Sequence, residues 1–136
     1  MIVGIGADLI EVERIADALA HRGDRFVARF CTDAERLVTP ALAPARYYAI
    51  VFAIKEAVLK ALGTGITRWV TWHDINVSIG KIEITVELTG GAKRRLSKLG
   101  GGEIRCFTSG SRLYVQAFVI IEQTPIVHLL GNGDAR

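Results

Sequence analysis

The sequence has few cysteines and prolines and no long apolar run. Its two cysteines, Cys31 and Cys106, lie 75 positions apart and form no CxxC or Cys/His spacing. That arrangement excludes a zinc ribbon and argues against a disulfide framework, so we interpret both as small buried hydrophobic side chains. The longest apolar run, 47–54, has eight residues, whereas a membrane span needs about 18. We therefore expect no membrane partner.

The beginning of the sequence also has no basic leader, since residues 1–4 read MIVG. A secretion signal carries a positively charged segment ahead of its apolar stretch. We therefore expect a soluble, cytoplasmic protein.

Composition supports one folded domain. Half of the 136 residues are apolar and 23% are charged, a balance that builds a core and excludes a disordered chain. The length suits a single domain, which we place at residues 1–122, with residues 123–136 as a C-terminal tail. A domain of this size buries only about two thirds of its unfolded surface, so association into an oligomer is a natural expectation.

The net charge of +3 is unevenly distributed. Between positions 91 and 112 the only acidic residue is Glu103, against six basic ones: Lys93, Arg94, Arg95, Lys98, Arg105 and Arg112. Such a cluster raises the question of nucleic-acid binding. No aromatic residues interleave with the basic ones over 93–98, so we favour a solvated helix face and expect no nucleic-acid partner.

The first part of the sequence predicts a strand followed by a helix. Residues 1–5 favour a short strand, which Gly4 and Gly6 break. Apolar residues then recur with helical spacing over 8–20, and Gly23 is a suitable stop.

A longer helix is predicted further along the chain. Thr32 and Glu35 fit a capping box that starts a short helix. Residues 46–62 continue as a helix of about seventeen residues that ends at Gly63. Its part over 47–54 is apolar all round, which indicates a helix buried on most sides; a strand is the competing interpretation of that run.

The second half of the sequence is rich in period-2 alternation, which is typical of strands. A turn at Gly80 and Lys81 separates two of these strands, a short helix is predicted over 92–99, and the last strand is apolar on both faces, as a central strand is. The predicted strands are 75–79, 82–88, 103–108 and 114–122. The fold class is therefore α+β, an antiparallel sheet packed with one long buried helix and shorter helices.

Charged residues near the end of the long helix are candidates for chemistry. Glu56 and Lys60 lie four residues apart and share one face. An ordinary surface ion pair is the alternative, but the apolar turns before them favour a cleft or a subunit boundary. Gly63, Thr64 and Gly65 follow, and their backbone N–H groups and hydroxyl suit phosphate oxygens; a simple glycine cap and turn is the alternative.

Asp8 is the second acidic candidate, at the predicted start of the first helix. Its ordinary interpretation is a helix N-cap, or a carboxylate that interacts favourably with the positive end of the helix dipole. The functional interpretation is a ligand for a hard metal, because Mg²⁺ is held by one or two carboxylates together with substrate phosphates. Asp8 and Glu56 would supply those two carboxylates, although spacing alone does not show that they meet.

Two motifs carry a family resemblance. Residues 4–15 (GIGADLIEVERI) resemble the N-terminal signature of the holo-[acyl-carrier-protein] synthases, and residues 52–65 (FAIKEAVLKALGTG) resemble their second signature. Two motifs in order and at a family-like separation are more specific than either alone. The resemblance covers about residues 1–122 and leaves the tail outside.

The resemblance implies a Mg²⁺-dependent enzyme of lipid metabolism that serves fatty acid biosynthesis. It moves 4′-phosphopantetheine from coenzyme A to a serine of an apo acyl carrier protein and releases 3′,5′-ADP. Asp8 and Glu56 would bind Mg²⁺, and Glu56, directly or through a metal-bound water, would accept the serine proton. The coenzyme would be bound by Lys60, Gly63, Thr64, Gly65 and Arg46.

The resemblance also implies partners. The enzymes of this type are homotrimers with active sites at subunit interfaces, so we expect the same here. The helix that carries Arg14 would face the carrier protein, whose recognition helix is typically acidic. Arg22 and Arg25 would extend that surface, and so would Arg29.

The sequence departs from the family at two phosphate-side positions. The family usually has a histidine in its last hairpin, where this chain has Gly110, and a basic residue where this chain has Val51. These departures favour an alternative, a diverged homologue that binds a carrier protein or coenzyme A but has lost or changed the transfer. A transferase that serves a secondary-metabolite carrier protein lies between the two. Asp8, Glu56 and Lys60 are retained, which argues against complete loss of catalysis.

Overall fold

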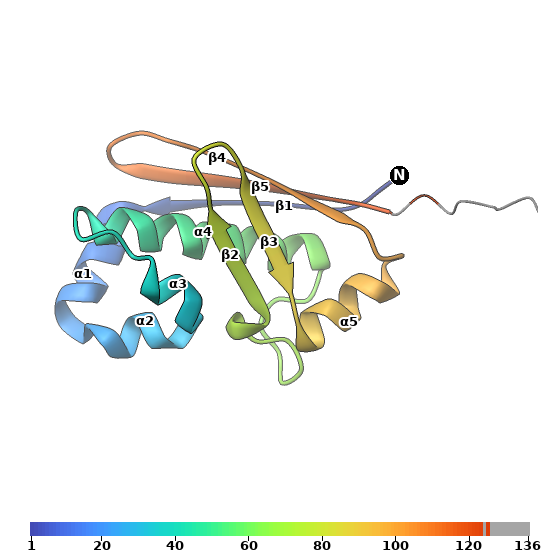
Figure 1. Ribbon diagram of the computed structural model, residues 1–136, viewed down its shortest axis with the longest axis horizontal. Helices are drawn as coiled ribbons and strands as arrows, with labels where there is room; N and C mark the ends of the chain where they lie inside the picture. Colours follow the sequence, from blue (N-terminus) through green and yellow to red (C-terminus); the bar gives the residue numbers. More distant parts are fainter. Residues whose placement is uncertain (124, 126–136) are drawn as a thin grey trace, which may run out of the picture.

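The computed structural model describes residues 1–123 and Pro125 (Figure 1). Most of the predicted tail at 123–136 therefore lies outside the described residues. In chain order the elements are β1 (Ile2–Glu11), α1 (Val12–Arg22), α2 (Asp24–Phe30), α3 (Asp33–Leu37), α4 (Pro44–Leu62), the 3₁₀ turn η1 (Trp72–Asp74), β2 (Ile75–Ile79), β3 (Ile84–Leu88), α5 (Gly90–Lys98), β4 (Glu103–Gly110) and β5 (Tyr114–Glu122).

The strands form two antiparallel sheets rather than one. A three-stranded sheet has the order β1-β5-β4, and β2 pairs with β3 in a separate hairpin. The prediction that the last strand is central is confirmed, because β5 pairs with β1 on one side and β4 on the other. The α+β class is therefore correct.

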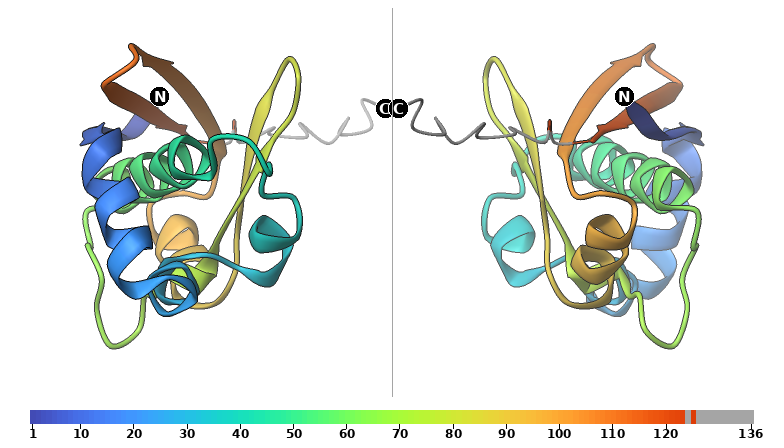
Figure 2. Two further views of the ribbon diagram at one scale, coloured as in Figure 1. Left: turned by 90° about the vertical axis from the view of Figure 1, so that its left-hand side faces the viewer. Right: turned by 90° about the vertical axis from the view of Figure 1, so that its right-hand side faces the viewer.

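Helix α4 is the centre of the core. It packs against β1 and β5 on the inner face of the three-stranded sheet, and α1 lies against its other side. In the end-on views the sheet lies above α4 and the β2-β3 hairpin lies along its flank (Figure 2). The helical interpretation of residues 47–54 is correct and the strand alternative is wrong, because Pro44 opens the helix and Gly63 closes it at φ 72°. No helix among the described residues is long and apolar enough to cross a membrane.

The first strand is longer than predicted. It continues through Asp8 to Glu11, and α1 starts only at Val12. The cause is the pairing of β1 with β5, which extends to the pair Glu11 and Tyr114. The predicted helical start at residue 8 is therefore wrong, and Asp8 is a strand residue opposite Ala117 rather than a helix cap.

The ends of the short helices and of the β2-β3 turn agree only in part with the predictions from local sequence patterns. The capping box of Thr32 and Glu35 is confirmed, since each side chain bonds the backbone of the other residue. Gly23 ends α1 with φ 52°, as predicted, but α2 follows immediately and was not expected. The β2-β3 turn is longer than predicted, because Gly80 N–H donates to the Glu83 carbonyl and β3 begins at Ile84.

The prediction that both cysteines are buried is correct for Cys31 only. Cys31 is buried and Cys106 is half-buried. Burial is the largest cause that raises the pKa of Cys31 to about 12 and the pKa of Cys106 to about 11. Neither thiol is therefore suited to act as a nucleophile near neutral pH.

Candidate active site

Two glycines bring β1 into direct contact with α4. A Cβ on Gly4 would overlap the carbonyl oxygen of Ala61, and a Cβ on Gly6 would overlap the carbonyl oxygen of Ala57. Only glycine leaves room for a strand backbone to lie against a helix backbone at this distance. The prediction that these glycines break the strand is therefore wrong: β1 runs through both of them, and they set its contact with the helix. The next strand residues are consequently held beside Glu56 and Lys60.

The contact brings the predicted acid and base groups together. The Lys60 ammonium donates to Asp8 Oδ1 at 3.0 Å and to the Ala7 carbonyl at 2.9 Å. Partial burial and then the negative charge of Asp8 raise the pKa of Glu56, while Lys60 lowers it. Asp8, Glu56 and Lys60 thus form one electrostatically coupled cluster, although the chain separates Asp8 from Lys60 by 52 positions.

This cluster fits a hard divalent cation. Asp8 Oδ2 is buried and has no hydrogen-bond partner, and an orphan carboxylate oxygen in that state costs free energy. The Glu56 carboxylate is close enough to repel it. No group of three or more His, Cys, Asp or Glu residues within the described part of the chain suits a metal. Mg²⁺ needs only one or two carboxylates when phosphates and waters complete its shell.

The turn after α4 adds polar groups at the same end of the helix. Gly63 and Gly65 adopt left-handed backbone conformations with φ 72° and 62°. Between them the Thr64 hydroxyl oxygen is buried and has no hydrogen-bond partner. The glycine cap and turn is therefore present, and it carries an unsatisfied hydroxyl one turn beyond Lys60.

Arg46 lies apart from this cluster within one chain. It is in the first turn of α4, ten residues before Glu56, which corresponds to about 15 Å along the helix axis. Its guanidinium donates to the Ser111 carbonyl at 2.7 Å and lies against Gly110 in the β4-β5 hairpin. The predicted coenzyme-binding set is thus not gathered completely in a single chain.

The two departures from the family have different surroundings. Val51 is fully buried in the core, so no charged side chain is accommodated at its position without a partner. The position of Gly110 is exposed, and the space beside it is occupied by the Arg46 guanidinium.

Basic and aromatic residues line a small groove beside α1. The groove has a volume of about 270 Å³ and includes Arg14 and Arg22, whose guanidinium lies 5.5 Å from the ring of Phe26. Phe26 and Phe52 form part of its apolar wall. Arg25, the third predicted carrier-binding residue, does not line the groove. The role of the two phenylalanines in the groove was not predicted; Phe26 follows Arg25 in the sequence, and Phe52 was recognised only as the first residue of the second motif.

Sequence reasoning also missed a buried ion pair next to the cluster. Lys55 Nζ lies 2.9 Å from Glu35 Oε2, and both side chains are inaccessible to solvent. The ammonium also donates to the carbonyls of Phe30 and Trp72, while the second oxygen of Glu35 accepts from Val77 N–H at 2.8 Å. The pair is fully hydrogen-bonded and fixes α4 against α2, α3 and β2.

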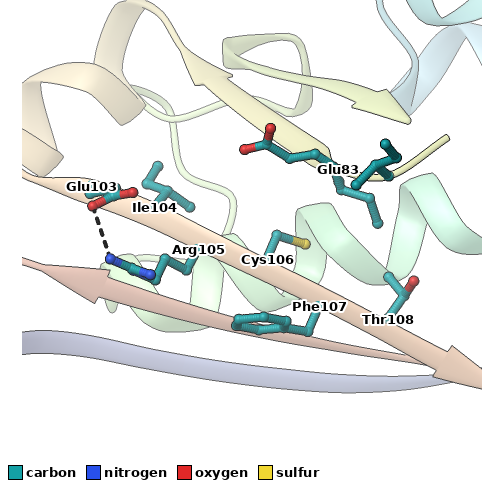
Figure 3. Close-up of a pocket in the computed structure, with 9 residues that line it drawn as sticks. Glu83, Glu103, Ile104, Arg105, Cys106, Phe107 and Thr108 are labelled. Atoms are coloured by element: carbon teal, nitrogen blue, oxygen red, sulfur yellow. Dashed lines mark hydrogen bonds and ion pairs between the residues drawn. The ribbon is translucent and has the colours of Figure 1, made fainter. Parts of the chain in front are cut away.

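A separate groove lies between the edges of β3 and β4 (Figure 3). It holds about 410 Å³. Ile104 and Cys106 point toward β3 while Phe107 points the other way, and Arg105 pairs with Glu103 at 3.3 Å. None of the predicted site residues lines this groove, so we do not assign the chemistry to it.

Strand β1 and helix α4 bring the carboxylates of Asp8 and Glu56 close to the Lys60 ammonium. Such a site is suited to metal-assisted phosphate chemistry. The family model described as the 4′-phosphopantetheinyl transferase superfamily matches residues 4–115. A holo-[acyl-carrier-protein] synthase from Phenylobacterium zucineum is 44% identical over 131 residues, which are 92% of this chain and 95% of that protein. The chain therefore belongs to the 4′-phosphopantetheinyl transferase superfamily.

Solved structures agree with this assignment. The holo-[acyl-carrier-protein] synthase from Neisseria meningitidis is 32% identical, with a TM-score of 0.82 over 90% of this chain and 100% of that chain. The holo-(acyl-carrier-protein) synthase from Bacillus anthracis str. Ames, solved in complex with CoA (3′,5′-ADP), is 31% identical, with a TM-score of 0.75 over 91% of this chain and 99% of that chain. The family resemblance of the two sequence motifs is thus confirmed.

Proposed function

We propose that this protein transfers 4′-phosphopantetheine from coenzyme A to a serine hydroxyl of an apo acyl carrier protein, with Mg²⁺, and releases 3′,5′-ADP. The observation that carries the proposal is the orphan oxygen of Asp8 beside Lys60 and Glu56. A relative of known structure that binds CoA supports the choice of coenzyme.

The reaction exchanges one phosphorus–oxygen bond for another. The serine oxygen bonds to the phosphorus that carries the pantetheine, and the bond from that phosphorus to the bridging oxygen breaks. The bridging oxygen leaves with the electron pair as part of 3′,5′-ADP, and the serine proton is taken up by Glu56.

Asp8 and Glu56 would hold the Mg²⁺ ion. When bound, the ion neutralises charge on the diphosphate and orients it for in-line attack. Lys60 is half-exposed, so its ammonium is able to move from Asp8 to a phosphate oxygen. Gly63, Thr64 and Gly65 would line the nucleotide pocket, with the unpartnered Thr64 hydroxyl as a donor.

The carrier protein would dock in the groove beside α1. Arg14 and Arg22 outnumber the one acidic lining residue, Glu11, and offer positive charge to an acidic helix. Phe26 and Phe52 offer an apolar floor to its hydrophobic side chains. This arrangement would bring the carrier serine to the Asp8 end of β1, because Leu9 and Ile10 belong to the same groove wall.

The outer face of the three-stranded sheet favours association of copies of this chain. Large apolar side chains are exposed there on all three strands, among them Ile5 (65%), Leu9 (58%), Phe107 (56%) and Phe118 (42%). Exposed apolar patches of this kind mark protein interfaces. Three copies follow from the family resemblance, and Arg46, which contacts the β4-β5 hairpin from the first turn of α4, would then complete the site of a neighbouring subunit.

The alternative is a homologue that keeps the carrier surface without the transfer. It is favoured by Gly110, because the family usually has a histidine at this position. In this chain the Arg46 guanidinium occupies the space beside Gly110. Cytoplasmic location and the lack of a nucleic-acid partner stay predictions.

One experiment separates the two functions. Purified protein is incubated with an apo acyl carrier protein, coenzyme A and Mg²⁺, and the intact mass of the carrier is measured. We expect a gain of one phosphopantetheine group that EDTA abolishes. Asp8→Asn and Glu56→Gln should each lower the rate at least a hundredfold, while the exposed control Glu87→Gln should not. If none of several carrier proteins gains mass, the proposed transfer is wrong and the alternative, a diverged homologue without transfer activity, is supported.

A further inference from the structure

A basic pocket lies between the loop after α4 and helix α5, outside the Asp8 cluster. It has a volume of about 620 Å³. Three cations line it, Arg94, Arg95 and Lys98, and the opposite wall carries Thr64, Thr67 and Trp69. We call it the α5 pocket.

The cations of the α5 pocket are not balanced by acidic side chains. Arg94 and Lys98 lie four residues apart on α5, a spacing at which like charges destabilise a helix. Arg95 Nε donates to the Leu62 carbonyl at 2.8 Å, which fixes its guanidinium at the end of α4. No carboxylate within the described part of the chain lines the pocket. An anion bound there would relieve this repulsion.

Two threonines, Thr64 and Thr67, belong to the loop wall of the α5 pocket. The Thr64 hydroxyl oxygen is buried without a hydrogen-bond partner. Thr67 Oγ1 accepts from the N–H groups of Trp69 and Val70 at 3.1 and 3.0 Å, which leaves its own hydrogen free to donate. Buried polar groups without partners are uncommon, and an absent ligand is one cause.

The wall is also held in place. A Cβ on Gly91 would overlap the Trp69 carbonyl oxygen, so the loop backbone lies directly against the start of α5. The Arg68 guanidinium stacks 4.5 Å from the Trp69 ring centre and orients that exposed indole at the pocket. The pocket is therefore built before any ligand arrives, which reduces the ordering cost of binding.

We propose that the α5 pocket binds a phosphate group, held by Arg94, Arg95 and Lys98 with hydrogen bonds from the threonine hydroxyls. Arginine forks and a lysine point charge are the ordinary recognition elements for phosphate. The phosphate belongs either to the coenzyme of the proposed transfer or to a separate phosphorylated molecule. Binding itself does not depend on the proposed function.

Isothermal titration with inorganic pyrophosphate tests the proposal. It is done in EDTA at low ionic strength, so that no divalent cation recruits phosphate to Asp8. We expect Arg94→Gln combined with Lys98→Gln to weaken binding at least tenfold. Lys93→Gln, which removes a charge from the same helix outside the pocket, should change affinity less than twofold. Equal affinity of the double variant and the wild type, or an equal loss in the control, overturns the proposal.

Transfer kinetics then distinguish the two sources of phosphate. If the 3′-phosphate of coenzyme A enters the pocket, the double variant has a raised KM for coenzyme A and an unchanged KM for dephospho-coenzyme A. If a separate molecule enters it, neither KM changes while pyrophosphate affinity still falls. Either result supports the α5 pocket, and failure of transfer itself leaves the titration unaffected.

Discussion

Gly6 of β1 packs against Ala57 of α4 so closely that any Cβ at residue 6 would overlap the Ala57 carbonyl oxygen. Ala57 is the neighbour of Glu56, and Asp8 is two strand residues beyond Gly6 on the same face. The distance between the two carboxylates is thus set by a contact between backbones. Backbones adjust less readily than side chains, so the pair is held in place although its charges repel.

Gly6→Ala should separate β1 from α4. Overpacking of a closed interface costs about 1–3 kcal/mol, and the displaced strand carries Asp8 away from Glu56. We expect a lower melting temperature and a loss of transfer activity that persists at temperatures where the variant is still folded. Ser78→Ala, at an exposed position of β2 outside the three-stranded sheet, is the control. Wild-type activity in a folded Gly6→Ala protein would show that the contact does not set the site.

The sequence predicted half of this arrangement. Glu56 and Lys60 share a helix face by spacing alone, and the structure confirms that they lie in one cluster with Asp8. The family resemblance implied that Asp8 acts with Glu56, but the place of Asp8 within a strand was not predictable from the local pattern, because it depends on how far β1 pairs with β5. Helical spacing over 8–20 is real in the sequence, but the strand pairing that ends at Glu11 overrides it.

The buried pair of Glu35 and Lys55 was not predictable for a related reason. The sequence identified Glu35 as part of a capping box, and that role is confirmed. One Glu35 oxygen accepts both from the Thr32 N–H and from Lys55. The second partner comes from another helix, and no local pattern records it.

The raised pKa of Glu56 predicts a pH-dependent stability difference. The folded state binds this proton more tightly than the unfolded chain, so the contribution is present below the ordinary pKa of 4.5 and is lost as the pH rises through the folded value. Glu56→Gln removes the titration. In EDTA we therefore expect its melting temperature to match the wild type near pH 4 and to exceed it at pH 7. A difference that is constant with pH would contradict this assignment.

Breaking the buried ion pair should be more costly than replacing it. Lys55→Met leaves the Glu35 carboxylate buried without its cation, a change that costs about 3–5 kcal/mol. Combining Lys55→Met with Glu35→Leu removes both charges and should recover part of that loss, while the N–H groups of Thr32 and Val77 lose their Glu35 acceptor. Urea unfolding of the two single variants and the double variant measures the coupling. Additive losses would mean that the pair contributes no coupling to stability.

The exposed apolar face of the sheet predicts a self-association interface. Phe118 lies at the centre of β5, opposite Phe107 of β4 and Ala7 of β1. Phe118→Glu would place a charge in the middle of any contact between copies. We expect light scattering to show a trimer for the wild type and a monomer for the variant, with transfer activity lost. The exposed control Glu87→Gln should remain a trimer.

Gly110→His restores the residue that the family usually carries, and the structure predicts that it will not help. A Cβ at position 110 would lie 2.6 Å from the Tyr114 carbonyl oxygen and 2.9 Å from Arg46 Nη2, so both the hairpin and the arginine must move. We expect a lower melting temperature and no gain in coenzyme A affinity. Arg46→Ala in the same background frees the side-chain space and should recover part of the stability. Tighter coenzyme binding by Gly110→His alone would contradict this prediction. It would show that the hairpin and Arg46 move readily and that a histidine at position 110 binds the coenzyme.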